Sequence, residues 1–259
     1  MVAYAVMSNN ESVFYLLSNR TVVLVLAFVG GFVDSAGYMK LFGLFTSSIT
    51  GNLVVACTTG FREGDGVWAR LFVTLAFMVG AFVTTLFYLR LKYKLKVNPW
   101  DIGIVLFSCE AIALAVAGAI GIYINHTSAG YGHIDSWETI LEGTLLALSM
   151  GIHNAAAQDV VPSCPSTTVM TMTMVKTSML AANTLQFFLA SKGLDVYDHM
   201  ELDVVLEKFH TARTKLLDHV VQVMCFATGA VVGAVLALHI NFWCLGLPLM
   251  MILAVVASI

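Results

Sequence analysis

The stretch GGFVDSAGYMKLFGLFTSSITGN, residues 30–52, constrains the fold more than any other part of the chain. It begins as an apolar helix, meets a single carboxylate at Asp34, and then becomes rich in glycine, serine and threonine. In a bilayer, polar and glycine-broken backbone is costly unless it is buried in protein or lines a water-filled cavity. The stretch therefore predicts a helix that breaks inside the molecule.

The composition indicates a membrane protein. Of 259 residues, 59% are hydrophobic and only 11% are charged, whereas a soluble domain has roughly 25% charged residues. Several apolar runs approach the ~20 residues that cross a bilayer as a helix. We therefore predict an all-α polytopic membrane protein that forms a single membrane domain over residues 1–259.

Charge and cysteine usage limit the partners. The net charge of −3 comes with no cluster of lysine and arginine of the kind that binds nucleic acid. The five cysteines are scattered singly without zinc-ligand spacing, so we expect no metal site, no disulfide framework and no cofactor. The expected partners are the lipid bilayer and a small solute or ion, and the sequence leaves open a homo-oligomer.

Hydropathy predicts six full spans and two shorter, interrupted segments. The spans are residues 21–41, 68–91, 102–124, 137–157, 219–240 and 242–259, and the interrupted segments are 44–61 and 166–190. Lysine and arginine gather in the loops 90–96 and 192–215, and the loop 125–136 has neither. Basic loops stay in the cytoplasm. Both basic loops and both termini are cytoplasmic if the interrupted segments are re-entrant or broken, whereas the basic loops face opposite sides if both segments cross.

Two parts of the chain resemble each other. Residues 25–36, VLAFVGGFVDSA, align with residues 145–156, LLALSMGIHNAA, so that Asp34 falls opposite Asn154. Further on, FMVGAFV from Phe77 matches FATGAVV from Phe226. We predict repeat halves at 21–124 and 137–259, with an amphipathic cytoplasmic insertion at 191–217. Three crossings in each half would place the halves in opposite orientations, and such inverted repeats bind their substrates where the halves meet.

The stretches around Asp34 and Asn154 resemble the signature of the YoaK-like family of six-span membrane proteins, a domain of unknown function found widely in bacteria. In that family a Gly-x-x-Asp-Ala-x-Gly-Phe run precedes Ser-Phe-Met-Thr-Gly-Asn, and a later Gly-Leu-Gln-Asn-Ala run precedes Thr-Gly-Thr. The matching positions are Gly31, Asp34, Gly37, Thr50, Gly51, Asn52, Gly151, Asn154, Ala155, Thr171 and Thr173. His153 stands in place of glutamine, and Met172 in place of glycine. The resemblance covers essentially the whole chain and implies a fold without a substrate.

Asp34 is the leading candidate for chemistry. A carboxylate near the middle of a span costs about 2.5–3.5 kcal/mol on insertion scales, so it should face protein or water and have a partner. Proton coupling is the functional interpretation, and a structural ion pair or helix–helix hydrogen bond is the alternative. Lys176, which lies deep in an apolar segment, is expected to neutralise Asp34 or Glu110.

The other candidates surround the two interrupted segments. His153 and Asn154 form a polar pair, although a hydrogen-bonded core histidine is the alternative for His153. Serine and threonine at 46–50 and 166–173 offer helix starts that favour anions, unless the hydroxyls bond back to their own helices. The predicted substrate-binding residues are Asp34, Thr50, Gly51, Asn52, His153, Asn154, Thr171 and Thr173, with Lys176 and Glu110 as charge partners.

We therefore expect a secondary transporter or channel-like carrier of a small polar or anionic solute, proton-coupled through Asp34. A non-transporting membrane scaffold or assembly protein is the alternative. An intramembrane enzyme is a weaker hypothesis, because the sequence has no GxSxG, HExxH or paired-carboxylate spacing. Asp34 with His153 would be its one acid–base pair.

Overall fold

The computed structural model describes residues 9–61, 64–127, 131–161, 170–192 and 202–259, with side chains from residue 20 onward. Helices make up the regular structure of these residues, and no strand occurs among them. Residues 166–169 of the expected segment 166–190, and residues 193–201 of the expected insertion, lie outside the described residues. The helices are α1 (Asn9–Lys40), α2 (Ile49–Gly60), α3 (Val67–Leu89), η1 (Arg90–Lys94), α4 (Pro99–Thr127), α5 (Trp137–Val160), α6 (Met170–Ser191), α7 (Leu202–Ile240), η2 (Asn241–Leu245) and α8 (Gly246–Ser258).

The all-α polytopic membrane class is confirmed. Within the described residues, four helical segments are long and apolar enough to cross a bilayer: Arg20–Lys40, Val67–Lys94, Pro99–Thr127 and Leu202–Ser258. The last of these holds two helices, because the chain turns at η2 between α7 and α8. The 24-residue α5 is also long enough, but it carries Glu138, Glu142 and His153 along its length. The total of six spans stays a prediction.

The helix that runs into the glycine-rich stretch breaks, as the sequence predicts. α1 ends at Lys40 and α2 begins at Ile49. Phe42 and Gly43 between them have φ values of 54° and 78°, the left-handed conformation that glycine adopts without strain. Residues 41–48, called the α1–α2 loop below, therefore reverse the chain sharply.

Glycines bring two pairs of helices into backbone contact. A Cβ added to Gly31 of α1 would collide with the carbonyl oxygen of Phe226 in α7, and one added to Gly229 of α7 would collide with that of Phe28. In the second pair, a Cβ on Gly151 of α5 would collide with the carbonyl oxygen of Phe77 in α3. Only glycine allows helix backbones to approach this closely.

The two interfaces correspond residue by residue. A Cβ added to Gly80 of α3 would lie 2.6 Å from the carbonyl oxygen of Leu148 in α5, and this contact corresponds to that of Gly229 with Phe28. In the first helices of the two predicted halves, the corresponding residues Leu148 and Phe28 are 120 positions apart. In the third helices, the corresponding residues Gly229 and Gly80 are 149 positions apart. Within each pair the helices run in the same direction. α1 and α5, the first helices of the two predicted halves, run in opposite directions, with Leu26 near His153 and Leu41 near Gly143.

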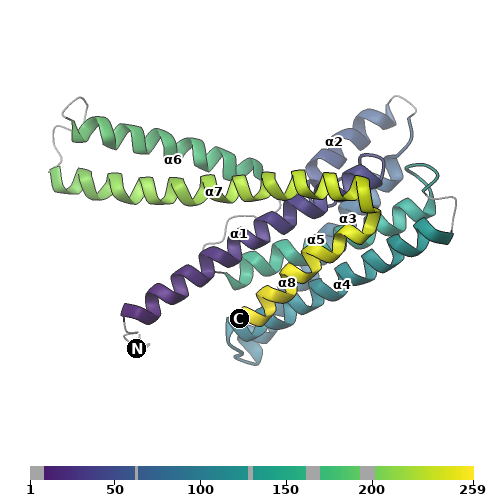
Figure 1. Cartoon of the computed structure of the whole chain (residues 1–259), viewed down its shortest axis with the longest axis horizontal. Coiled ribbons are helices and arrows are strands. Elements are labelled where there is room, and N and C mark those ends of the chain that lie inside the picture. Colours follow the sequence, from purple (N-terminus) through teal and green to yellow (C-terminus); the bar gives the residue numbers. More distant parts are fainter. Residues whose placement is uncertain (1–8, 62–63, 128–130, 162–169, 193–201) are drawn as a thin grey trace.

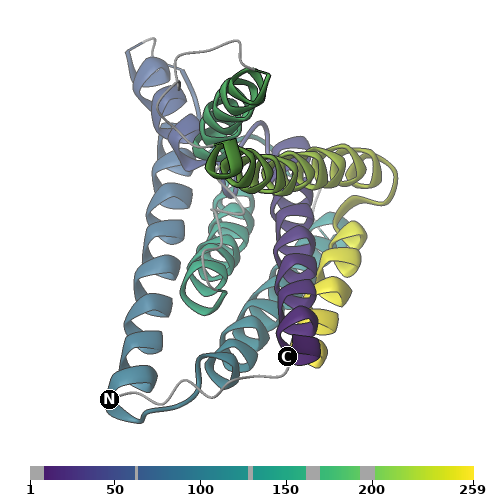
Figure 2. The ribbon, with the colours of Figure 1, turned by 90° about the vertical axis from the view of Figure 1, so that its left-hand side faces the viewer.

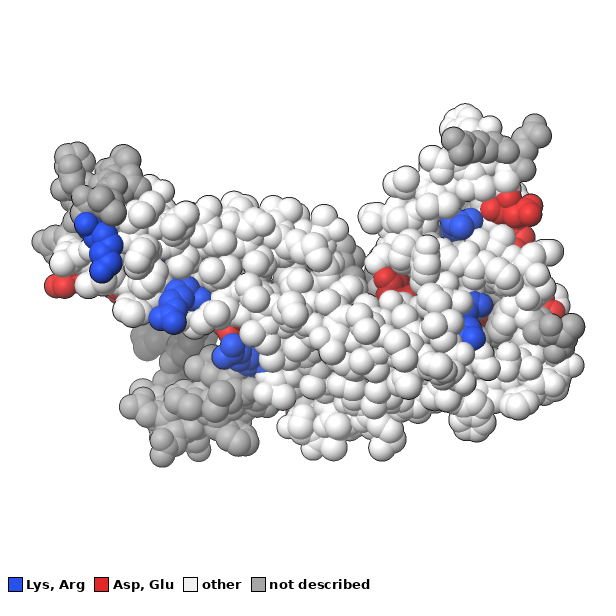
Figure 3. Space-filling model, turned by 45° about the horizontal axis from the view of Figure 1, so that its top comes forward, with Lys and Arg blue, Asp and Glu red and all other residues white. Residues whose placement is uncertain are grey.

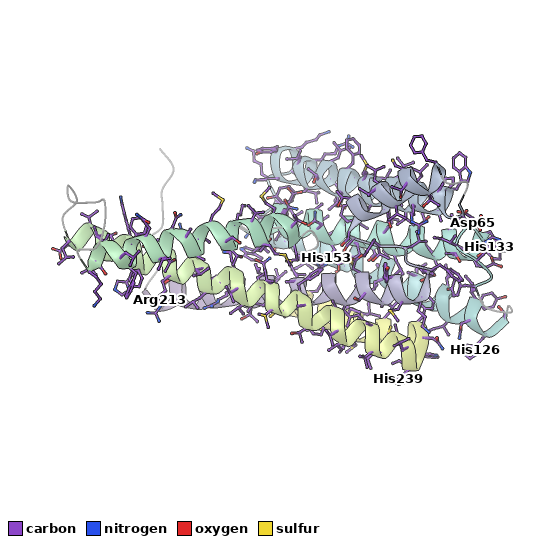
Figure 4. All side chains as sticks on the ribbon, turned by 90° about the horizontal axis from the view of Figure 1, so that it is seen from above. Asp65, His126, His133, His153, Arg213 and His239 are labelled. Carbon is purple, nitrogen blue, oxygen red and sulfur yellow. The ribbon has the colours of Figure 1, made fainter. Side chains whose placement is uncertain are left out.

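The bundle has two distinct ends. At one end, here called the Asp135 end, Asp135 accepts hydrogen bonds from the Gly66 and Ala69 N–H groups at the start of α3, at 2.6 and 3.2 Å. Asp65, His126, His133 and His239 lie together at this end (Figure 4). η1, with the sequence RLKYK, lies at the opposite, basic end.

Beyond the basic end, α6 and the first part of α7 project from the bundle as a two-helix arm (Figure 1; Figure 2 shows the same arm after a quarter turn). Phe188 of α6 packs on Phe209 of α7, with ring centroids 5.9 Å apart. Lysine and arginine side chains stand out along the arm on an otherwise largely uncharged surface (Figure 3). Residues 202–217 of the expected amphipathic insertion at 191–217 are not a separate element, since they form the first part of α7, which continues for 39 residues without a break.

Candidate functional site

The carboxylate of Asp34 holds the α1–α2 loop against α1. Its Oδ1 accepts from the backbone N–H groups of Thr46 at 2.8 Å, Ser47 at 2.7 Å and Ser48 at 3.3 Å. The Ser48 hydroxyl donates to Oδ2 at 2.6 Å. Asp34 is only 6% exposed, so the polar backbone of the break is satisfied inside the protein. Its partners are backbone N–H groups and a serine hydroxyl, whereas the sequence predicted Lys176 as a partner of either Asp34 or Glu110.

Asn52 fixes the same loop from the other side. Its Nδ2 donates to the Phe45 carbonyl at 2.6 Å, and its Oδ1 accepts from the Phe45 N–H at 3.0 Å. The side chain therefore satisfies both backbone groups of one residue, as a neighbouring strand would. Asn52 is fully buried. Asp34 and Asn52, both predicted site residues, thus meet on the α1–α2 loop without contacting each other.

The threonines at the helix starts lie differently. Thr50 in the first turn of α2 and Thr171 in the first turn of α6 are exposed, whereas Thr173 is buried at 1% exposure. Gly51 lies against the ring of Phe45, where an added Cβ would come within 3.1 Å. Thr50 and Thr171 are therefore the members of the predicted set whose side chains remain accessible.

The centre of the bundle contains an acid–base pair that joins three helices. His153 of α5 places Nδ1 2.7 Å from Oε1 of Glu110 in α4, and its Nε2 lies 3.1 Å from the carbonyl oxygen of Leu26 in α1. Both side chains are completely buried. Figure 4 shows His153 inside the bundle, far from the histidines at the Asp135 end. The acid that contacts His153 is thus Glu110, and not Asp34.

Lys176 does not neutralise either carboxylate. Its side chain is exposed on α6, while Glu110 is paired with His153 and Asp34 with the loop. The sequence places Lys176 within an apolar segment, but it does not show which face of α6 is covered by other helices. The arm leaves most of α6 uncovered, since only Met170 and Thr173 are buried on it. Asn154, next to His153, is half-buried and also makes a polar contact of its own.

A buried polar line on α5 leads from the Asp135 end toward this pair. Glu142, Ser149 and His153 are spaced seven and four residues apart, which places them on one face of the helix, and all are fully buried. Among the described residues, neither carboxylate oxygen of Glu142, nor Ser149 Oγ, nor Glu110 Oε2 has a hydrogen-bond partner. This line was not predicted, although the spacing of Glu142, Ser149 and His153 in the sequence indicates a shared helix face.

Tyr131 lies over the start of the polar line. Its hydroxyl is buried and has no partner among the described residues. Burial, together with the carboxylates of Glu142 and Glu138, raises the pKa of Tyr131 well above its usual value. Tyr131 therefore remains a neutral hydroxyl next to Glu142. Within the described part of the chain, no group of three histidine, cysteine, aspartate or glutamate side chains could hold a metal ion.

Comparison with known proteins agrees with the membrane class. The chain is 26% identical over 156 residues to the UPF0700 transmembrane protein YoaK of Bacillus subtilis (strain 168), a match that covers 60% of this chain and 64% of that relative. The chain thus spans less than two thirds of the relative's length. No solved structure matches. The family described as "Protein of unknown function (DUF1275)" matches residues 22–258, nearly the whole chain. The protein therefore belongs to the DUF1275 family of YoaK-like membrane proteins.

Proposed function

We propose that this membrane protein is a secondary transporter or channel-like carrier of a small polar or anionic solute. The observation that supports the proposal most is the α1–α2 loop, where a helix breaks inside the bundle and its backbone is satisfied by Asp34 and Asn52. Broken helices of this kind are a recurring feature of transporters, where they lie beside the substrate.

The matched glycine interfaces support the inverted-repeat part of the proposal. α1 with α7 and α3 with α5 make the same backbone contacts at corresponding residues, and α1 and α5 run in opposite directions. The third helix of each half packs on the first helix of the other half. This gives two bodies, one formed by α1 with α7 and the other by α3 with α5. Alternating access is largely a rocking of such bodies about a fixed site.

The proposed solute contacts divide the predicted residues into two groups. Asp34 and Asn52 hold the loop, and Thr50 and Thr171 offer accessible hydroxyls at the starts of α2 and α6. A small anion would approach the start of α6, since helix starts attract negative charge. The Asp34 carboxylate already lies at the start of α2, so the Thr50 hydroxyl would contact a neutral polar part of the solute. Proton coupling through Asp34 is the less favoured version, because the Asp34 carboxylate only accepts hydrogen bonds from the backbone N–H groups.

The test is uptake into proteoliposomes that contain the purified full chain. A panel of inorganic anions, short carboxylates and neutral polyols is presented with and without a pH gradient. We expect saturable uptake of one class, and a several-fold loss of uptake in Thr50→Val and Thr171→Val. Thr58→Val is the matched control, because Thr58 is exposed at the far end of α2, where its hydroxyl donates to the carbonyls of Val54 and Val55. Absence of uptake across the whole panel would contradict the proposal.

One observation favours the non-transporting scaffold instead. Asp34 and Asn52 both bond to the chain's own backbone, which is also what a purely structural motif would do. The scaffold predicts that substitutions at Thr50 and Thr171 leave all measurable properties unchanged. We propose no enzymatic activity.

A further inference from the structure

The Glu110–His153 pair must contain one proton between its facing atoms. The Leu26 carbonyl can only accept a hydrogen bond, so His153 Nε2 carries a hydrogen and donates it at 3.1 Å. The 2.7 Å contact between Nδ1 and Glu110 Oε1 then needs one further proton. That proton is on Nδ1 in an imidazolium–carboxylate pair, or on Oε1 in a neutral pair. The total charge of the pair is zero in both forms.

Loss of that proton would leave one hydrogen for two contacts. A neutral imidazole would keep it on Nδ1, where it donates to the negatively charged Glu110 oxygen, and Nε2 would then face the Leu26 carbonyl oxygen with a lone pair in place of a hydrogen. Gain of a second proton would leave a buried imidazolium with a neutral acid. Both changes leave a buried net charge, which is strongly destabilising, so either change favours a rearrangement that admits water or a new partner.

The contact is positioned to transmit such a rearrangement. Leu26 belongs to α1, which packs along α7, whereas His153 belongs to α5, which packs along α3. α1 and α5 touch over a much shorter length than each touches its parallel partner. The His153–Leu26 hydrogen bond is therefore a direct polar link between the two bodies.

A route for the proton lies on the same helix. Glu142 and Ser149 precede His153 on the buried face of α5, and their side-chain oxygens have no partner among the described residues. Glu110 Oε2 is likewise without one. Buried polar atoms without partners are few in native proteins and call for an explanation. The unpartnered atoms of Glu142 and Ser149 lie about 10 Å apart along α5 at 1.5 Å per residue, and His153 follows one turn later, which fits transient protonation better than packing does.

The titratable side chains around the pair decide how it can respond to pH. α8 carries none, and Lys176 of α6 is exposed. On the other helices around the pair, counting α7 from Asp218 onward, the titratable or charged side chains that the structure describes are Arg20, Asp34, Tyr38 and Lys40 on α1, Arg70 and Tyr88 on α3, Asp101, Cys109, Tyr123 and His126 on α4, Glu138, Glu142 and Asp159 on α5, and Asp218, His219, Cys225 and His239 on α7. Arg20 and Asp218 form an ion pair at 2.7 Å. Several of the other side chains have partners too, since Asp34 holds the loop, Asp159 accepts from Thr85, Tyr88 accepts from Lys92, and Arg70 donates to the Gly66 carbonyl.

We propose that Glu110 and His153 form a one-proton site, and that its deprotonation releases α5 from Leu26 so that the two bodies separate. The proton is exchanged with water at the Asp135 end through Glu142 and Ser149, and water molecules have to bridge the roughly 10 Å between these two residues along α5. The inference rests on the proposed transport function only for its biological purpose, where the site would couple a proton to solute movement. The structural change itself occurs without solute.

The test measures the distance between the two bodies as a function of pH. Spin labels are placed at Phe82→Cys on α3 and Met224→Cys on α7, both exposed positions, in the full chain with its native cysteines replaced and held in nanodiscs. We expect one distance population at acidic pH and a second that grows as pH rises. Glu110→Gln should keep the first population at every pH, because its amide N–H can donate to Nδ1 and cannot titrate. Asp159→Asn, on the same helix as His153, should respond as the unmodified chain does.

Two results would overturn the inference: distances that do not depend on pH, or a Glu110→Gln protein that titrates as its parent does. The outcome is independent of the uptake experiment. Distances that change with pH in a protein without uptake would leave the one-proton site standing and remove the transport function. Uptake together with distances that ignore pH would do the reverse.

Discussion

Asp34 and Glu110 are both carboxyl groups buried among apolar helices, yet their surroundings differ in kind. Asp34 is surrounded by donors, three of them backbone N–H groups, and all act within one segment of chain. Glu110 faces a single imidazole from another helix and keeps one oxygen without a partner among the described residues. The first arrangement fixes a shape, and the second stores a proton. A buried charge in a membrane bundle therefore has to be judged by its partners and not by its depth.

The largest expected effect is at Asp34. Replacement by alanine would leave three backbone N–H groups and the Ser48 hydroxyl without an acceptor, at about 1–3 kcal/mol each and not fully additive. We expect a loss of about 5 kcal/mol in unfolding free energy, measured by SDS titration in mixed micelles. Asp34→Asn keeps an acceptor oxygen and should lose less than half as much. Equal losses for the two variants would show that Asp34 is more than an anchor.

The next effect is at the central pair, where the two partners should not be equivalent. His153→Ala leaves Glu110 buried without any cation or donor, which costs about 3–5 kcal/mol. Glu110→Ala leaves a neutral imidazole that keeps its Leu26 bond, and should cost about 1–3 kcal/mol. A double-mutant cycle in the same unfolding assay measures the coupling between them. Strict additivity would mean that the two side chains do not interact in the bilayer.

Asn52 gives a smaller effect of the same type as Asp34. Asn52→Ala removes both bonds to the Phe45 backbone, and we expect a loss of about 2 kcal/mol. Limited proteolysis should then cut within the α1–α2 loop before it cuts elsewhere. Asn52→Asp is the matched variant, since it keeps the bond from the Phe45 N–H but turns an acceptor oxygen toward the Phe45 carbonyl oxygen in a buried site. It should lose at least as much as the alanine variant.

Lys176 should give the smallest effect. Its side chain is exposed on α6, so Lys176→Met is expected to change the unfolding free energy by less than about 0.5 kcal/mol. A partner of Glu110 or Asp34 would instead produce a large loss that a second, charge-removing substitution partly restores. Thermal unfolding of Lys176→Met, Glu110→Gln and the double variant distinguishes these cases.

Local features were predictable because they depend on residues that are close together in the sequence. Glycine at positions 37 and 43, followed by serine and threonine, predicts the break after Lys40, and apolar length predicts the membrane class. The alignment of Gly31 with Gly151 was also predicted from the sequence, and both glycines lie in corresponding helix interfaces. In each case the signal comes from one short stretch of sequence, or from the likeness of two such stretches.

The partners of buried charges could not be predicted, because they depend on packing. Glu110 and His153 are 43 residues apart, and the third member of the contact is a backbone carbonyl, which has no sequence signal at all. The continuity of α7 was missed for a different reason. The change from polar to apolar composition near residue 217 looks like a boundary, but no glycine or proline interrupts the helix there.

The length of α7 has a mechanical consequence. Its 39 residues form a rod of about 58 Å at 1.5 Å per residue, and the 16 residues from Leu202 to Leu217 reach about 24 Å beyond the Arg20–Asp218 ion pair. A rigid rod works as a lever whose pivot lies at its contacts with α1. A tilt of about 10° in the bundle would move the free tip, which lies about 24 Å from the ion pair, by about 4 Å. A small change at the buried core would in this way become a displacement that a label on the arm can report.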